Sequence, residues 1–570
     1  MKIIIRTTKS NRKKLFFFFF FFLNKKKINM PYCYCFNVIV KLFKNQSTTP
    51  VPTLPTECME KIFLHVGLKE ELFSCLLVNK YWCKNVLPLL WANPFDGLES
   101  SKINNFKLIR MYLACLDNKE LNSLNSYLKH HNISLSISSK PLHDYTSFLE
   151  EFSYKKLELA VSFFLHEWHN RDYNIDYKEE IIFYLSSSIY NLFMSQATNL
   201  KSLKIDQHFR RLDIPDISTF SKIQPVITLS KITKFQLDYE KPVSNNLNNF
   251  LEILPKYSTE IKSMEFKITS FEYKFDIIKL IGNIIKLQNC LENFSLTGVQ
   301  NCVEDLMPEL HSKSDTLINV KFRNVHFTEH SLSLLSNFNN LKHFEIWYCD
   351  GLSSNSCKIL LSGDFPNLKR LHLGCSENQD LITAFLDKIG PSIIQLGLNI
   401  ITDGTIKAIL NNCTNLKDLQ IIDYHPMDHP GFFKLFHGLK GLERLRIKIS
   451  PDNKHYEKMI LWARIGAHDL PISLKYLKLE CGLPIYQLKR FLDPRNNKVT
   501  PHLSTLIIND LNFDYSHMEV ISDFVKKRGI LKVLGIGGPT KFSWRTLREF
   551  KTLREKYRVH IIPKDDLDQW

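Results

Sequence analysis

Several patterns that carry enzyme chemistry are missing from this chain of 570 residues. It has no G-x-x-x-x-G-K phosphate-binding loop and no nucleophile elbow, and GIGGP at 535–539 lacks the glycine spacing of a dinucleotide site. Histidines and carboxylates are abundant, but none forms a local set with an assignable acid, base or nucleophile. We therefore expect a non-catalytic protein that needs no cofactor.

Paired cysteines are missing too. The 13 cysteines are scattered, and the closest two, Cys33 and Cys35, are separated by one residue, which is too few for a CxxC redox or zinc motif. His166 and His169 are three residues apart, whereas the HExxH zinc motif needs four to place both imidazoles on one helix face. We predict no metal site. We read the cysteines as reduced thiols of a protein of the cytoplasm and/or nucleus.

Acidic residues are absent from residues 1–50, which carry 11 of the 17 excess positive charges. An apolar run at 15–23 lies there between RKK and KKK, and it is too short to span a bilayer, which takes about 20 residues. A secretory signal is one alternative, although lysines 25–27 stand where small residues should precede a cleavage site. We interpret 1–50 as a disordered leader or as a mispredicted start before Met30. The remaining charge is balanced, so we expect neither nucleic-acid nor membrane binding.

The segment 51–95 has the apolar spacing of three short helices. After Pro55, one apolar stripe follows i, i+3, i+4 and i+7 and consists of Met59, Ile62, Phe63 and Val66. A second stripe lies within 68–76, and a third helix carries Trp82 before Pro88 is expected to interrupt it. Three helices of this size cannot enclose a stable core alone, so we predict that the segment docks on another protein.

The same segment resembles the F-box, whose pattern is LP, then IF, then a V-C-x-x-W core, then LW. Leu54-Pro55, Ile62-Phe63, LLVN at 76–79, Trp82 and Trp91 match it, with Asn79 in place of the usual cysteine, and LLVNKYWC followed by LPLLWANPF is similar to fungal F-box proteins. The resemblance implies binding to a Skp-type adaptor and, through it, to a cullin. By the same resemblance, the core or adaptor contacts come from Leu54, Pro55, Ile62, Leu72, Leu76, Val78 and Trp82. A helical hairpin that opens a solenoid is the alternative.

Residues 96–190 form a predicted helical connector. Stretches such as NFKLIRMYLACL, SFLEEFSYKKLELAVSFFLHEW and EEIIFYLSSSIYNLF have helical apolar spacing and almost no Gly or Pro.

Residues 191–570 contain an internal repeat. The unit L-x-x-L-x-L, with conservative exchanges, begins at Leu200, Ile232, Ile261, Leu291, Leu317, Leu341, Leu368, Ile393, Leu416, Leu442, Leu474, Leu503 and Leu531. The spacing averages about 28 residues, and helix-period stretches lie between the units. We therefore predict an α/β leucine-rich-repeat solenoid of about 13 repeats, with parallel strands on the concave side and helices on the convex side. The units resemble the cysteine-containing leucine-rich repeats common in F-box proteins.

The third, fifth and seventh positions of each unit are expected to face the concave side, because the fourth and sixth are committed to the core. The predicted substrate-binding residues on that side are Arg323, His343, Trp347, Arg370, His372, Arg444, Arg446, Lys448, Tyr476 and Lys478. Their basic character favours an acidic or phosphorylated protein substrate. We predict a substrate receptor of a Skp–cullin–F-box ubiquitin ligase. The alternatives are a ligase-independent repeat scaffold or inhibitor, and a nucleic-acid binder.

Overall fold

The structure, a computed structural model, describes residues 54–66, 69–96, 102–131, 133, 135, 137, 141–168, 179–206, 213–216, 225–240, 244–268, 274–299, 303–374, 379–399, 401–422, 431–448, 470–480, 484–492, 502–510, 512–538 and 542–562. The described residues divide into two compact units. The helical unit comprises those within 1–152 and 156–200, and the repeat unit comprises 153–155 with those within 201–570. The leader, Cys33, Cys35 and His169 lie outside the described residues.

The first three helices of the helical unit are α3 (Thr56–Leu64), α4 (Lys69–Leu76) and α5 (Lys80–Trp91), in the places where the apolar stripes predict them. Pro88 does not interrupt the third helix as expected, because α5 continues through it to Trp91. A proline inside a helix removes one hydrogen bond and costs about 3 kcal/mol. Here Leu89 and Leu90 pack against the core of the module, and their burial offsets that cost.

The connector is helical in most of its length, with α6 (Lys102–Leu113), α7 (Asn118–Lys129), α8 (Tyr154–Trp168) and α9 (Glu179–Gln196). The prediction of a helix over 147–168 is wrong for the first residues of that stretch. There a short 3-10 turn η2 (Thr146–Phe148) is followed by strand β1 (Glu151–Ser153), and only then does α8 begin. β1 is the first strand of the sheet, and pairing along the sheet edge overrides the local helical pattern.

The repeat unit is a leucine-rich-repeat solenoid whose strands follow one another in chain order from β1 to β15 in a single sheet. From β2 onward each strand pairs in parallel with the next. The strands are β2 (Ser202–Asp206), β3 (Lys234–Tyr239), β4 (Ser263–Ile268), β5 (Asn293–Thr297), β6 (Asn319–Arg323), β7 (His343–Trp347), β8 (Arg370–Gly374), β9 (Gln395–Leu398), β10 (Asp418–Ile422), β11 (Arg444–Lys448), β12 (Tyr476–Glu480), β13 (Thr505–Asn509), β14 (Val533–Gly537) and β15 (His560–Ile562).

The thirteen predicted units coincide with β2 to β14, each strand starting two residues after the first apolar residue of its unit. The α/β solenoid prediction is therefore confirmed. Two further strands, β1 and β15, extend the sheet at its two ends. Each of these two strands has three residues, so neither can show the full six-residue pattern.

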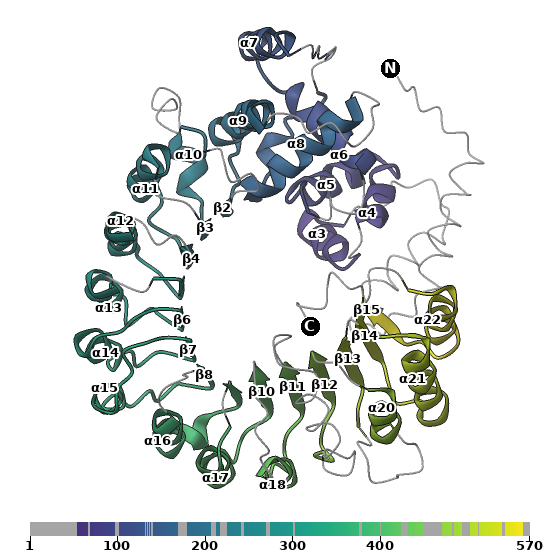
Figure 1. Cartoon of the computed structure of the whole chain (residues 1–570). Helices are drawn as coiled ribbons and strands as arrows, with labels where there is room; N and C mark the ends of the chain where they lie inside the picture. Colours follow the sequence, from purple (N-terminus) through teal and green to yellow (C-terminus); the bar gives the residue numbers. More distant parts are fainter. Residues whose placement is uncertain are drawn as a thin grey trace. The chain divides into compact units, whose positions relative to one another are not determined.

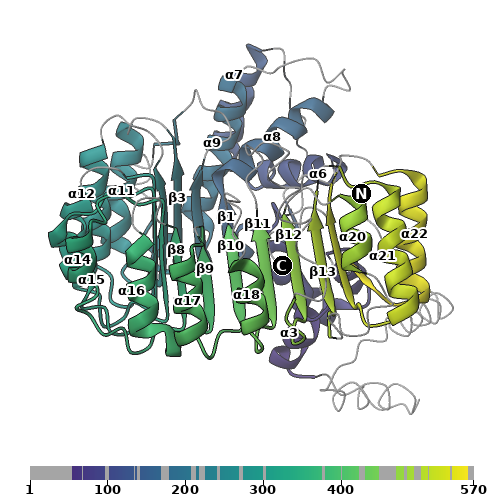
Figure 2. The same cartoon turned by 60° about the horizontal axis from the view of Figure 1, so that its bottom comes forward.

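Helices follow the strands and lie on one face of the sheet in the repeat unit, along the outer side of the arc of strands (Figure 1). They are α10 (Pro225–Ser230), α11 (Asn245–Tyr257), α12 (Lys274–Lys286), α13 (Met307–His311), α14 (Glu329–Leu335), α15 (Ser354–Leu360), α16 (Gln379–Ile389), α17 (Asp403–Asn412), α18 (Gly431–Gly438), α20 (Ile485–Phe491), α21 (Tyr515–Arg528) and α22 (Trp544–Lys556), with 3-10 turns η4 (Val303–Asp305) and η5 (Gly390–Ser392). Figure 2 shows α16, α17 and α18 in front of the strands that they cover. No helix among the described residues is both long enough and apolar enough to cross a membrane.

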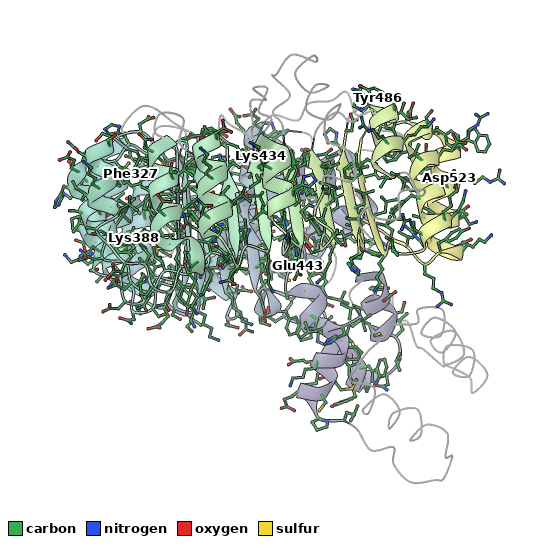
Figure 3. All side chains as sticks on the ribbon, turned by 90° about the horizontal axis from the view of Figure 1, so that it is seen from below. Phe327, Lys388, Lys434, Glu443, Tyr486 and Asp523 are labelled. Carbon is green, nitrogen blue, oxygen red and sulfur yellow. The ribbon has the colours of Figure 1, made fainter. Side chains whose placement is uncertain are left out.

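The core of the repeat unit lies between the sheet and these helices. The second and fourth side chains of the strands point into it, and in β3 to β6 four of them are phenylalanines in contact from one strand to the next. Their ring centroids are 5.9, 6.1 and 6.1 Å apart along the series Phe235, Phe266, Phe294 and Phe322. Charged residues occupy the far side of the helices, where Lys388, Lys434 and Asp523 are exposed (Figure 3). Among the described residues of the repeat unit, no helix lies on the other face of the sheet, which is called the open face below.

One turn of the repeat unit requires glycine. Gly351 follows β7 with φ of +79°, and a Cβ there would lie 1.9 Å from the carbonyl oxygen of Phe327 in the preceding repeat. We expect Gly351→Ala to lower the free energy of unfolding by about 1–3 kcal/mol, because both the backbone conformation and the space exclude a side chain. Denaturant unfolding followed by circular dichroism measures the change.

The matched control for this prediction is Gly441→Ala, since a Cβ at Gly441 would meet no atom within 4 Å. This variant is expected to stay within about 0.5 kcal/mol of the wild type. Equal stability of the two variants would contradict the proposed steric requirement.

Candidate protein-interaction sites

The helices α3, α4 and α5 enclose a small apolar core. Its buried residues are Met59, Phe63, Cys75 and Val86. The ring of Trp82 meets Phe63 edge-on with centroids 5.1 Å apart. Asn79 precedes helix α5, and its side-chain oxygen accepts a hydrogen bond of 2.8 Å from the backbone N–H of Trp82. Asn79 therefore has a local role as a helix N-cap.

The predicted adaptor contacts divide into two groups. Five of the seven are partly buried and pack against the core of the module: Leu54, Ile62, Leu72, Leu76 and Trp82. Pro55 is exposed, and Val78 is 41% exposed, so these two point outward. Leu54 is held further by its carbonyl oxygen, which accepts a hydrogen bond from the hydroxyl of Tyr81.

Three large apolar residues of the module escaped the sequence-based prediction. Leu64 is 66% exposed, Phe73 is 60% exposed and Leu77 is 59% exposed. Phe73 and Leu77 are four residues apart, so they share one side of α4 and its end. A signal was present in the sequence, because Leu64 follows Phe63 of the first apolar stripe, and Phe73 and Leu77 follow Leu72 and Leu76 of the second. We call Leu64, Phe73, Leu77 and Val78 the apolar docking residues.

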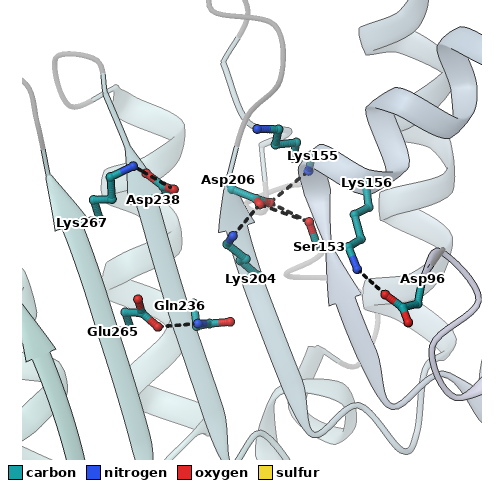
Figure 4. Close-up of polar contacts among 10 residues, drawn as sticks. All are labelled: Asp96, Ser153, Lys155, Lys156, Lys204, Asp206, Gln236, Asp238, Glu265 and Lys267. Atoms are coloured by element: carbon teal, nitrogen blue, oxygen red, sulfur yellow. Dashed lines mark hydrogen bonds and ion pairs between the residues drawn. The ribbon is translucent and has the colours of Figure 1, made fainter. Parts of the chain in front are cut away.

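The open face of the repeat unit carries polar side chains that pair across neighbouring strands. Figure 4 shows this at β2 to β4. The buried carboxylate of Asp206 accepts a hydrogen bond of 2.9 Å from the hydroxyl of Ser153 and lies 3.1 Å from Nζ of Lys204. On β3 and β4 the register partners Asp238 and Lys267 form an ion pair of 3.2 Å. Cross-strand pairs of opposite charge stabilise a sheet and leave little free charge.

A second polar group lies on β6 to β8 around Glu345, which is 1% exposed. Its Oε1 is 2.5 Å from Nη2 of Arg323. Its Oε2 is 3.7 Å from Nδ1 of His372 and 3.9 Å from Nε2 of His343. The two imidazole rings are themselves in contact, with centroids 5.0 Å apart. Arg323 is thus bound to an acid of its own chain.

The surroundings fix the charge of this group. Burial, followed by the charges of His372, Lys321 and Arg370, lowers the pKa of His343 to about 3. Burial by itself would raise the pKa of Glu345, but the hydrogen bond to His372 and the nearby cations lower it to about 2. At neutral pH Glu345 is therefore ionised and His343 is neutral.

A third polar group surrounds Asp418 on β10. Its Oδ2 lies 3.5 Å from Nε of Arg444 and 3.6 Å from Nη2 of Arg446. Burial raises the pKa of Asp418, and the two guanidinium groups oppose that effect. Arg444 also lies over the ring of Tyr476, 4.4 Å from its centroid. Further along the sheet, Glu480 pairs in the same way with cations on β11 and β12, namely Lys448 and Lys478.

Most of the basic residues predicted for the open face are thus paired with acids, mainly of neighbouring strands. Trp347 and Tyr476 are 6% exposed, so neither stands out as an anchor. The ring of Trp347 lies over β8, where a Cβ on Gly374 would be 2.6 Å from the indole. His343, His372 and Lys478 are buried as well. The residues of the predicted set that stay open to solvent, wholly or in part, are Arg323, Arg370, Arg444, Arg446 and Lys448.

The chain matches no known protein-family model and no curated protein. Among solved structures it is similar to a chain of the yeast Rad7–Elc1 complex, at 15% identity and a TM-score of 0.37, over 91% of this chain and 100% of that one. It is also similar to an internalin, InlF, of Listeria monocytogenes (15% identity, TM-score 0.27, 60% of this chain and 89% of that one). A third similar structure is that of the leucine-rich-repeat protein LegL7 of Legionella pneumophila (14% identity, TM-score 0.32, 57% of this chain and 97% of that one). With identities of 14–15% and TM-scores below 0.5, these similarities carry no argument about function.

Proposed function

We propose that this chain is the substrate-recognition subunit of a Skp–cullin–F-box ubiquitin ligase in the cytoplasm and/or nucleus. The observation that carries the proposal is a three-helix module with the F-box sequence pattern whose apolar docking residues remain exposed. The same chain continues into a leucine-rich-repeat solenoid. In this function the module binds a Skp-type adaptor, and the solenoid holds the protein substrate. Ubiquitin transfer is then promoted by proximity and is catalysed by other subunits.

The exposure of the apolar docking residues supports an adaptor-binding role. Water-exposed Leu and Phe side chains gathered on one small module are unfavourable in a free protein and are typical of a surface that a partner covers. A helical apolar surface of this size suits insertion into a groove of the adaptor. The partly buried members of the pattern, such as Trp82 and Leu72, then act by shaping the module.

The open face supports a role in holding a protein substrate. Its cross-strand ion pairs hold acidic and basic groups in fixed positions, and such a charge pattern discriminates among partners. Arg370 differs from the other arginines of this face. It is exposed, and its Nη2 donates a hydrogen bond of 3.2 Å to the neutral side chain of Asn319. We propose that it contacts an acidic or phosphorylated segment of the substrate, since guanidinium groups bind such anions well.

Co-purification tests the proposed ligase role. The full chain is expressed in eukaryotic cells, and its complexes are isolated under mild conditions. We expect a Skp-type adaptor and a cullin to be recovered together with it in amounts close to stoichiometric. Recovery of the chain without either subunit would instead support a ligase-independent repeat scaffold.

Charge reversal on the open face tests the substrate proposal. Loss of one charged hydrogen bond costs roughly 1.5 kcal/mol, which is about tenfold in affinity. We therefore expect Arg370→Glu to reduce recovery of the acidic or phosphorylated proteins that co-purify with the wild type by about tenfold. Quantitative mass spectrometry measures the recovery, with adaptor recovery as the internal standard. Lys434→Glu is the control, because Lys434 is exposed on α18 on the helix side of the sheet. An equal loss with both variants would show that net charge matters and the open face does not.

A further inference from the structure

Two histidines and one glutamate converge on the open face of the repeat unit. His343 and Glu345 are two residues apart on β7, so their side chains leave the strand on the same side. On β8 the register partner of Glu345 is His372. One donor atom from each of the three residues lies within 4.8 Å of the other two. The repeat geometry thus brings together ligand types from positions 29 residues apart in the chain.

A second observation is an unsatisfied polar atom. His343 is only 7% exposed, and its buried Nε2 has no hydrogen-bond partner among the described residues. A buried polar nitrogen without a partner is costly and calls for an explanation such as a bound ion. This nitrogen lies 3.9 Å from Oε2 of Glu345, the same oxygen that lies 3.7 Å from Nδ1 of His372.

We propose that His343, Glu345 and His372 bind one divalent transition-metal ion, with Zn²⁺ as the ion that this donor set fits best. Zinc bonds of about 2.0–2.1 Å in tetrahedral geometry place ligand atoms about 3.3 Å apart. Oε2 of Glu345 lies 3.7 Å from Nδ1 of His372 and 3.9 Å from Nε2 of His343, and shifts of about half an ångström bring both separations to that value. Three protein ligands leave a fourth position for water or for a side chain of a bound partner.

The neighbours of the three ligands have defined roles in the proposed site. Arg323 binds the other carboxylate oxygen, Oε1, and so orients Glu345 with Oε2 directed at the histidines. Lys321 is 4.0 Å from Oε2 and must turn away when an ion binds, which its 40% exposed side chain permits. The single carboxylate does not suit hard cations such as Ca²⁺ and Mg²⁺, which require several oxygen ligands. Imidazole nitrogens favour the zinc class instead.

Cobalt binding tests this site. The full-length chain, without a histidine tag and freed of metal with a chelator, is titrated with Co²⁺ while its visible d–d absorption is recorded. We expect the absorption to saturate at one equivalent and to disappear when Zn²⁺ is added. His343→Gln and His372→Gln are each expected to weaken Co²⁺ binding at least tenfold. His330→Gln is the matched control, since His330 is an exposed histidine of α14 in the same unit and is expected to leave the titration unchanged.

Two results would overturn the proposal. One is a wild-type chain with native circular dichroism that gives no saturable Co²⁺ absorption, and this result does not depend on any variant being stable. The other is an unchanged titration in folded His343→Gln and His372→Gln chains, which would place the ion elsewhere. Neither result bears on adaptor binding, because the apolar docking residues belong to the helical unit and adaptor recovery is a separate measurement.

Discussion

Replacing Phe73 and Leu77 with alanine is expected to weaken binding of a Skp-type adaptor at least about 20-fold. Full burial of a Phe or Leu side chain contributes about 1.5–3 kcal/mol, and covering the exposed part of these two contributes at least about 1.8 kcal/mol of binding free energy. Both side chains are about 60% exposed, at 60% and 59%, so the module loses little packing of its own. Alanine also keeps the helix propensity high. Isothermal titration calorimetry with purified adaptor measures the change.

Two further variants make this experiment specific. Phe63→Ala removes a ring that is 1% exposed and packs against Trp82, so it is expected to unfold the module, abolish binding and reduce the helical circular dichroism signal. Glu60→Ala changes an exposed residue of α3 outside the apolar docking residues and is expected to bind normally. The surface assignment fails if the Phe73/Leu77 variant is folded and binds the adaptor as tightly as the wild type.

Phe266→Ala is expected to have the largest effect on the stability of the solenoid, lowering the free energy of unfolding by about 3–5 kcal/mol. The ring of Phe266 is fully buried and touches phenylalanines of both neighbouring strands, with centroids 5.9 Å from Phe235 and 6.1 Å from Phe294. Its removal leaves a cavity that the flanking strands cannot close without breaking their register. Because a repeat is stabilised by its neighbours, we expect the loss to spread from β4 to β3 and β5.

Hydrogen exchange resolved by mass spectrometry measures this loss strand by strand, and denaturant unfolding gives its total. Trp544→Ala serves as the comparison, because Trp544 is an aromatic residue of the same unit with 66% exposure. It is expected to change stability by less than about 1 kcal/mol. Similar effects of the two substitutions would contradict the assigned core.

Much of the fold was predictable because it is local and repeated. The unit L-x-x-L-x-L specifies a strand with one buried side, and its recurrence at about 28 residues specifies a parallel stack. For this reason all thirteen strands from β2 to β14 were found from spacing alone. β1 and β15 were missed, since three residues carry too little periodicity to distinguish a strand from its surroundings.

The candidate sites were predictable only in part. Alternation along a strand placed His343, Glu345 and His372 on the open face. The spacing of residues within one strand does not determine which residue of the next strand lies opposite. That register decides that Arg444 and Arg446 meet Asp418. In the helical unit, the packing of the three helices decides that Phe73 stays exposed while its neighbour Leu72 is partly buried.

The sequence by itself therefore determined the repeat, the strand positions and the helical character of residues 51–95, because each depends on periodicity within a short segment. Only the tertiary structure decided which charges are paired, which rings are buried and where two histidines share a carboxylate. Those features depend on contacts between residues more than 20 positions apart, such as Arg323 with Glu345 and Glu345 with His372. The physical reason is that a stack of parallel strands brings together one residue from each turn of the solenoid, and side-chain packing selects the partners.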